Sequence, residues 1–304
     1  MLSTMTIPAI SFFLYTIFVL SARPSLIAAY NLADKRVLVT GASGGIGSGI
    51  AIALAQKGAR VVVHYNTRRE GAEETARFIR DHGGTCDGIV QSDFRIPANI
   101  PELFRQLDDI WGEGSGPDVL VNNAGVVSKL AVEDDDEDLN IWMETMQVNL
   151  HAPYHLSKLA YHRMKRTKGK EKGGVIINVS SIHGSISVEY MTAYAASKAG
   201  LDRLTAGLAS EWAQDNIRVN AVAPGVIPVE RTEALLSKKA QDLWLPHLPV
   251  GRMGNVKEVA HSVIYLCESD WSTGTILTID GGMTGRANMP FRPRPEKPEP
   301  EKCT

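Results

Sequence analysis

Short apolar runs alternate with longer amphipathic stretches along most of the chain. The runs are rich in Val and Ile and lie at residues 36–40, 60–65, 88–92, 118–123, 175–181, 217–224 and 275–280. Their near-continuous apolar character is typical of strands that are buried on both faces, and the stretches between them have helical periodicity. This alternation predicts an α/β fold, a doubly wound parallel sheet of about seven strands with helices on both faces.

The same pattern sets the domain boundaries. No glycine- or proline-rich linker interrupts residues 35–285, so residues 31–285 are expected to form a single domain. Residues 286–304 are rich in proline and charge and have little apolar surface to bury, which predicts a disordered tail.

The first 30 residues form a hydrophobic segment of a different kind. Residues 1–22 carry no charge, and the nearest positive charges, Arg23, Lys35 and Arg36, follow on the C-terminal side. One hypothesis is a membrane anchor over residues 7–22, which would leave the domain facing the cytosol. The alternatives are a weak signal peptide, an organellar transit peptide or a mispredicted start.

Composition narrows the function classes. The formal net charge is -2, which gives no electrostatic footprint for a polyanion, so nucleic acid is not expected as a partner. The three cysteines, Cys86, Cys267 and Cys303, are too far apart to suggest a disulfide framework or a zinc site. His151 and His155 have the spacing of a metal pair but lack an H-E-x-x-H context, so no catalytic metal is predicted.

A glycine-rich turn joins the first run to a helical pattern. It has the spacing T-G-x-x-x-G-x-G, with Gly41, Gly45 and Gly47 as its glycines and Ser43 and Ile46 between them. Glycines let the backbone approach a pyrophosphate closely, and the N-terminus of the following helix offers free N–H groups and a partial positive charge. The segment therefore predicts a dinucleotide site.

Tyr194 and Lys198 are four residues apart, which places them on one face of a helix. An ammonium near a phenol favours the phenolate and lowers the pKa of the phenol toward the range of a general acid or base. Ser181 ends the 175–181 run, where a hydroxyl can hydrogen-bond a substrate oxygen. Its neighbour Ser180 should face the other way. No G-x-S-x-G elbow surrounds Ser181, which argues against a serine hydrolase, and a simple loop histidine is the preferred interpretation of His183.

Together these motifs resemble the short-chain dehydrogenase/reductase superfamily, with its Rossmann fold, from about Lys35 to Gly285. Further matches are N-N-A-G at 122–125, P-G at 224–225 and D-G-G at 280–282. The resemblance implies Asn149, Ser181, Tyr194 and Lys198 as catalytic residues, with Asn149 holding a water behind the lysine and Lys198 also bonding the nicotinamide ribose. It implies that Asp93 contacts the adenine. The expected cofactor-binding residues are Gly41, Ser43, Gly45, Ile46, Gly47, Asn66, Arg68, Asp93, Asn123, Ala124, Gly125, Tyr194, Lys198, Pro224, Gly225 and Ile227.

One position departs from the family pattern. Val229 stands where many members have a threonine that bonds the nicotinamide carboxamide, so backbone groups of Val226 and Ile227 are expected to anchor that amide. Thr232 could substitute only if the loop bends. The segment from Val229 to Val250 is expected to form a small helical lid over the substrate, although its apolar residues could equally pack on the core.

The end of the second run bears on the choice of nicotinamide cofactor. An acidic residue there would accept hydrogen bonds from a ribose 2′-hydroxyl and repel a 2′-phosphate. The chain has no carboxylate before Glu70, whereas Asn66, Thr67, Arg68 and Arg69 could coordinate a phosphate. NADP(H) is therefore favoured over NAD(H); the alternative is that the arginines begin a solvated helix.

These features predict an oxidoreductase that interconverts a ketone and a secondary alcohol, as an NADPH-dependent carbonyl reductase of the 3-oxoacyl type. The substrate is expected to be a small-molecule or acyl carbonyl or alcohol compound. Two alternatives are an NAD-linked sugar or alcohol dehydrogenase and a catalytically silent dinucleotide-binding scaffold. The resemblance also implies a homodimer or homotetramer.

Overall fold

The computed structural model describes residues 30–135, 137–166, 173–230, 232 and 237–285. The strands are β1 (Arg36–Val39), β2 (Arg60–Tyr65), β3 (Thr85–Gln91), β4 (Val119–Asn122), β5 (Gly174–Val179), β6 (Ile217–Pro224) and β7 (Ile276–Ile279). The α-helices are α2 (Gly45–Gln56), α3 (Arg69–Asp81), α4 (Asn99–Trp111), α5 (Asn140–Met146), α6 (Ala152–Arg166), α7 (Thr192–Trp212), α8 (Lys238–Trp244) and α9 (Val256–Glu268). Short turns of helix complete the chain: η1 (Val132–Asp134), η2 (Gln147–His151), η3 (Ile182–Gly184), η4 (Ala213–Asp215) and η6 (Leu245–His247).

All seven strands join one sheet in the order β3-β2-β1-β4-β5-β6-β7, and every neighbouring pair is parallel. Parallel neighbours require a crossover between strands, and the helices supply these crossovers. The predicted fold class, a single doubly wound sheet, is confirmed. The strand order reverses between β1 and β4, which is where doubly wound sheets open a crevice at their carboxyl edge.

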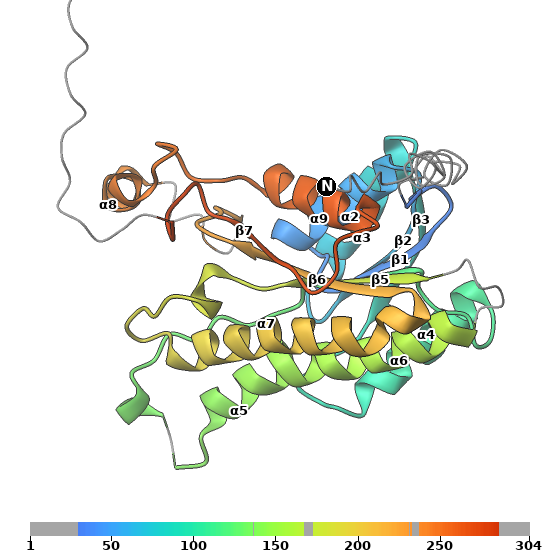
Figure 1. Ribbon diagram of the computed structural model, residues 1–304, viewed down its shortest axis with the longest axis horizontal. Coiled ribbons are helices and arrows are strands. Elements are labelled where there is room, and N and C mark those ends of the chain that lie inside the picture. Colours follow the sequence, from blue (N-terminus) through green and yellow to red (C-terminus); the bar gives the residue numbers. More distant parts are fainter. Residues whose placement is uncertain (1–29, 136, 167–172, 231, 233–236, 286–304) are drawn as a thin grey trace, which may run out of the picture.

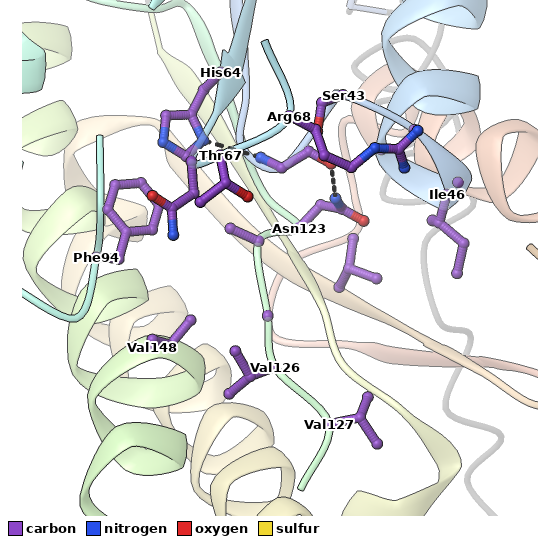
Figure 2. A pocket seen from close by; sticks show the side chains of 18 of the residues that line it. Ser43, Ile46, His64, Thr67, Arg68, Phe94, Asn123, Val126, Val127 and Val148 are labelled. Atoms are coloured by element: carbon purple, nitrogen blue, oxygen red, sulfur yellow. Dashed lines mark hydrogen bonds between the residues drawn. The ribbon is translucent and has the colours of Figure 1, made fainter. Parts of the chain in front are cut away.

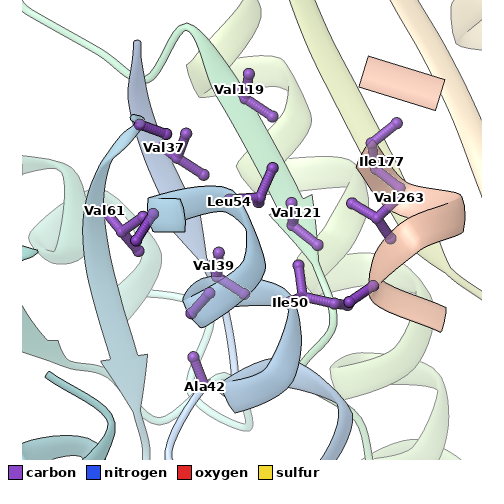
Figure 3. Close-up of a cluster of buried hydrophobic side chains, with 14 of the residues drawn as sticks. Val37, Val39, Ala42, Ile50, Leu54, Val61, Val119, Val121, Ile177 and Val263 are labelled. Atoms are coloured by element: carbon purple, nitrogen blue, oxygen red, sulfur yellow. The ribbon is translucent and has the colours of Figure 1, made fainter. Parts of the chain in front are cut away.

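Helices cover both faces of the sheet. In Figure 1, α2, α3 and α9 lie over one face, and α4, α6 and α7 lie over the other. Along β1, Val37 and Val39 belong to the apolar cluster beneath α2, α3 and α9, whereas Leu38 belongs to the cluster on the opposite face. Figure 3 shows part of the first cluster, in which Ile50 and Leu54 of α2 pack over the sheet. Both faces of the strand are therefore dry, which explains why its sequence is apolar without alternation.

The composition of the two terminal segments predicts separate roles for them. The hydrophobic segment and the proline-rich tail fall almost wholly outside the described residues, so an anchor over residues 7–22 stays a hypothesis. Within the described part of the chain, no helix is both long enough and apolar enough to span a bilayer.

A buried histidine links three segments at the carboxyl edge of the sheet. Nδ1 of His64, near the end of β2, accepts a hydrogen bond from the N–H of Gly41 at 3.0 Å, and Nε2 donates to the carbonyl of Ser92 at 3.0 Å. The ring stacks on Phe94 with their centres 4.5 Å apart. These contacts fix the neutral imidazole, and burial lowers the pKa of His64 to about 4. The residue thus braces the turn after β1 against the loop after β3.

The buried, neutral His64 makes the free energy of unfolding depend on pH. Between pH 6.5 and 4 the unfolded chain binds a proton at His64 that the folded chain does not, so stability is lost as the pH falls through this window. The shift from 6.5 to about 4 corresponds to about 3 kcal/mol. Urea titrations at pH 7 and pH 4.5 should show a larger loss of unfolding free energy in the wild type than in His64→Asn, whose amide can still accept from Gly41. Equal losses in the two proteins would show that His64 does not cause the loss of stability at low pH.

Candidate active site

A cleft of about 800 Å³ opens at the carboxyl edge of the sheet, near the strand-order reversal. Figure 2 shows it from close by. Twelve residues predicted from the sequence line it: Gly41, Ser43, Gly45, Ile46, Gly47, Asn66, Arg68, Asn123, Ala124, Gly125, Tyr194 and Lys198. The glycine turn and the tyrosine–lysine pair, which are about 150 residues apart in the sequence, therefore face one cavity.

The glycine turn has a shape that a side chain would not permit. Gly41 has φ +62° and Gly45 has φ +55°, in the left-handed region that favours glycine. A Cβ atom added to Gly47 would overlap the carbonyl oxygen of Gly41 and the side chain of Asn123. Asn123 in turn holds the turn in place, donating from Nδ2 to the carbonyls of Thr40 and Gly41 at 2.9 and 3.0 Å. The cradle is thus open to a close backbone approach, and its residues fit the pyrophosphate of a dinucleotide.

A carboxylate already lies at this cradle. Oε2 of Glu230 accepts a hydrogen bond at 3.0 Å from the N–H of Gly45, the first residue of α2. Free amides at a helix N-terminus attract anions, so Glu230 uses a group that would otherwise serve a phosphate. Val229 packs beside it, with its Cβ 3.4 Å from where a Cβ of Gly45 would lie. The sequence did not reveal this contact because it joins residues 185 positions apart.

The two arginines after β2 have different surroundings. Arg68 lines the cleft, and its Nη1 would lie 3.0 Å from a Cβ atom placed on Gly44. Arg69 instead pairs with Glu73 one turn along α3, at 2.8 Å on an exposed surface. Of these two arginines, only Arg68 is therefore placed to meet a ligand in the cleft.

Asp93, predicted to contact the adenine, follows β3 and is not among the residues lining the cleft. Its carboxylate pairs with Arg95 at 2.6 Å, and these hydrogen bonds hold the pKa of Asp93 below its usual value. Asn66 also hydrogen-bonds Asp93. The adenine role of Asp93 stays a prediction.

Lys198 carries a buried positive charge beside Tyr194. The lysine is 4% exposed, its Nζ donates to the carbonyl of Val179 at 2.9 Å, and it lies 5.7 Å from the centre of the Tyr194 ring. One turn further along α7, burial raises the pKa of Asp202 and the nearby Lys198 partly offsets this effect. The pair predicted from Y-x-x-x-K spacing therefore does meet on one face of α7.

Asn149 lies behind this pair, in the π-helical turn η2. It is fully buried; Oδ1 accepts from the N–H of Val126 at 2.8 Å, and Nδ2 donates to the Val126 carbonyl at 2.8 Å and to Ser197 Oγ at 3.2 Å. A Cβ atom on Gly125 would lie 3.2 Å from Asn149 Oδ1 and 3.8 Å from Lys198 Nζ. Asn149 thus ties the loop after β4 to α7, and π turns of this kind are frequent at functional sites.

Ser180 and Ser181 have different hydrogen-bond partners. Ser180 Oγ hydrogen-bonds Asp202 and lies 3.5 Å from the carbonyl of Lys198. Ser181 Oγ lies 3.1 Å from Nδ1 of His183 and accepts from the His183 backbone N–H at 3.2 Å. Ser180 lines the large cleft, whereas Ser181, the serine expected to reach the site, is not among the lining residues and instead contacts His183, whose ring packs against Tyr194. The catalytic role of Ser181 stays a prediction.

The remaining predicted residues, Pro224, Gly225 and Ile227, lie at the end of β6 and just after it. A Cβ atom on Gly225 would come 2.8 Å from Asp280, which accounts for glycine at this position by close packing. Ile227 is 9% exposed and packs in the core, and neither it nor Pro224 is among the residues that line the cleft. The following loop bends, since the Thr232 hydroxyl bonds both the N–H and the carbonyl of Val229. Part of the expected lid is helical, as α8 and η6.

Three further lining residues had other expectations attached to them: Thr67 as a phosphate ligand, Ser180 as the serine facing away, and Val229 as the replacement of the family threonine. The other lining residues had no signal in the sequence, namely Gly44, His64, Ser92, Phe94, Arg95, Val126, Val127, Glu144, Val148, Val179 and Glu230. Within the described residues, no three His, Cys, Asp or Glu side chains gather as metal ligands. The prediction of no catalytic metal stays a prediction.

Comparison with known proteins gives consistent matches. Residues 41–284 match the family model described as enoyl-(acyl carrier protein) reductase. A 3-oxoacyl-(acyl-carrier-protein) reductase from Haemophilus influenzae is 37% identical over 252 residues, covering 82% of this chain and 98% of that protein. A 3beta-hydroxysteroid dehydrogenase from Eggerthella lenta is 36% identical over 258 residues, covering 84% and 95%. The solved gluconate 5-dehydrogenase from Burkholderia cenocepacia, in complex with NADP and tartrate, has a TM-score of 0.76 and 29% identity, covering 86% of this chain and all of that one.

The position of Glu230 leads to a prediction about cofactor affinity. Glu230→Gln keeps an acceptor for the Gly45 amide but removes the negative charge from the cradle. NADPH should then bind roughly 2- to 5-fold more tightly, as expected for about 0.3–1 kcal/mol from one charge at a helix N-terminus. Fluorescence titration with NADPH measures this change. The control is Glu113→Gln, an exposed residue after α4, which should leave the affinity unchanged. Unchanged or weaker binding to Glu230→Gln would rule out competition at the cradle.

Proposed function

Because the chain belongs to the short-chain dehydrogenase/reductase superfamily, whose members are oxidoreductases acting on CH–OH groups with NAD or NADP, we propose that it is an NADPH-dependent carbonyl reductase. The superfamily resemblance carried by the sequence motifs is confirmed by these matches. The reaction proposed is the reduction of a ketone to a secondary alcohol, with 3-oxoacyl compounds as the preferred class of substrate.

One observation carries the proposal: the glycine cradle and the Tyr194–Lys198 pair line the same cleft. The cradle residues would hold a dinucleotide at the carboxyl edge of the sheet, which also carries α7 with Tyr194 and Lys198. A nicotinamide bound there would supply the hydride for the carbonyl carbon. The substrate oxygen would then face the phenol of Tyr194.

The residues of the chain handle the proton and the developing charge. Tyr194 gives its phenolic proton to the carbonyl oxygen in reduction and removes the hydroxyl proton in the reverse direction. Lys198 stabilises the phenolate that remains, because its buried ammonium lies beside the ring. Ser181 hydrogen-bonds the same oxygen as negative charge develops on it. Asn149 holds the backbone behind Lys198. A water bound there would return a proton to Tyr194 after reduction.

The preference for NADP(H) rests on Arg68. Its guanidinium lines the cleft, and the chain has no carboxylate between the end of β2 and Glu70 that would repel a 2′-phosphate. An NAD-linked sugar or alcohol dehydrogenase is the competing assignment. A silent dinucleotide-binding scaffold is disfavoured because Asn149, Ser181, Tyr194 and Lys198 are all present.

We also propose that the protein works as a homodimer or homotetramer with its domain facing the cytosol. Exposed apolar side chains on α5 and α6 support association through this face: Ile141 is 38%, Met143 55% and Tyr154 48% exposed. The orientation rests only on the charges that follow residues 7–22, and attachment to a membrane stays a hypothesis.

The role of the phenol can be tested with Tyr194→Phe. Loss of the proton donor should lower kcat about 10²- to 10⁴-fold, the usual contribution of general acid–base catalysis. The Kd for NADPH should change little, because the phenol acts on the substrate oxygen. A panel of ketones and 3-oxoacyl compounds, followed by loss of NADPH absorbance, gives kcat, and fluorescence titration gives Kd. A mutant with ordinary rates would refute the assignment. A wild type that binds NADPH but reduces no carbonyl would favour the scaffold.

Arg68→Glu tests the choice of cofactor. Loss of a charged hydrogen bond to the 2′-phosphate, typically about 1.5–3 kcal/mol, should weaken NADPH roughly 10- to 100-fold and NADH much less. Kd values for both cofactors, measured by fluorescence, give the comparison. The matched control is Arg69→Glu, since Arg69 pairs with Glu73 away from the cleft. Equal losses for NADPH and NADH in Arg68→Glu, or a wild type with higher kcat/KM for NAD, would support the NAD-linked alternative.

A further inference from the structure

His183 contacts both side chains that are proposed to meet the substrate oxygen. Its Nδ1 lies 3.1 Å from Ser181 Oγ, and its ring packs edge-on against Tyr194 with the ring centres 5.5 Å apart. The imidazole is half-buried, and this burial lowers the pKa of His183. A histidine that merely occupied a loop would not need to touch both groups.

The hydrogen bonds of Ser181 can be counted. A serine hydroxyl has one proton and two acceptor lone pairs. The backbone N–H of His183 donates to Oγ at 3.2 Å, so one lone pair is already used. The remaining lone pair and the single proton must be shared between Nδ1 of His183 and the substrate oxygen.

Two arrangements are then available. If Nδ1 is bare, Ser181 gives its proton to the imidazole and presents only a lone pair to the substrate oxygen, which repels the charge that develops there. If Nδ1 carries the proton, it donates to Ser181, both lone pairs are filled, and the serine proton is left for the substrate oxygen. Only the second arrangement stabilises the transition state. Reduction and oxidation pass through the same transition state, so the same arrangement serves both directions of the reaction.

We propose that His183 is a positioning residue that, as the Nδ1–H tautomer, directs the Ser181 hydroxyl proton toward the substrate oxygen. This inference rests on the proposed function, because it assigns Ser181 to a carbonyl or carbinol oxygen. The hydroxyl would be oriented before the substrate arrives, so that its reorientation costs nothing during the reaction. His183 itself need not touch the substrate.

Two nearly isosteric substitutions test the direction of this hydrogen bond. His183→Asn places an amide near the position of Nδ1, where it can donate to Ser181, whereas His183→Asp places only acceptors there. We expect kcat to fall about 10-fold in His183→Ala, the equivalent of one hydrogen bond. His183→Asn should recover most of this loss, and His183→Asp should be slower than His183→Ala. The Kd for NADPH should stay constant in all three.

A Ser181→Ala background separates positioning from other roles. There the rates of His183→Ala and His183→Asn should be equal, because the group that they orient is gone. If His183→Asn remained faster than His183→Ala without Ser181, His183 would act on the substrate directly, and the proposal would be wrong. It would be equally wrong if His183→Asn were as slow as His183→Asp in the presence of Ser181.

A second readout does not depend on turnover. In ¹⁵N-histidine-labelled protein with NADP⁺ added, the resonances of His183 are identified by their loss in His183→Asn. The proposal requires Nδ1 to carry the proton in the wild type and this preference to weaken in Ser181→Ala. A dominant Nε2–H tautomer in the wild type would overturn it. If the wild type reduced no carbonyl, the proposed function would fail, and the spectrum would still decide how His183 and Ser181 are bonded.

Discussion

The buried ammonium of Lys198 is the constraint on which the site depends. A charge that is 4% exposed must be compensated, and here the carbonyl of Val179 accepts from Nζ at 2.9 Å while Asp202 lies one turn along the same helix. Nζ lies 5.7 Å from the centre of the Tyr194 ring, and an ammonium this close favours the phenolate over the neutral phenol. The sheet edge, η2 and α7 are arranged so that this charge stays beside the phenol.

The other half of the cleft is also organised by charge. The N-terminus of α2 presents backbone amides, and the glycines of the turn keep side chains away from them. The turn itself is held by the hydrogen bond from Gly41 to His64. Glu230 accepts from one of those amides, so the loop after β6 contacts the cradle directly. Glu230 belongs to the segment from Val229 to Val250 that is expected to form the lid, so the expected lid begins at the glycine cradle.

Much of this arrangement follows from local sequence. Unbroken apolar runs predict a sheet with two dry faces, because residues such as Val37 and Leu38 face opposite clusters and both must be apolar. The four-residue spacing of Tyr194 and Lys198 predicts their meeting on α7, because helix geometry fixes it. The positive φ values at Gly41 and Gly45 agree with glycines recognised from spacing alone. Twelve of the predicted site residues line the cleft, and the roles assigned to the predicted residues remain proposals.

What could not be predicted are contacts between distant segments and the directions of single side chains. Nothing local distinguishes Arg68, which faces the cleft, from Arg69, which pairs with Glu73 outside it. The hydrogen bonds from Gly45 to Glu230 and from Gly41 to His64 depend on how distant segments meet at the sheet edge. The effect of Lys198 on Tyr194 is measured most directly by titrating ¹³Cζ-labelled tyrosines with NMR in the wild type and in Lys198→Met. The account predicts that the pKa of the Tyr194 phenol is lower in the wild type than in Lys198→Met, and the same titration in both proteins would contradict it.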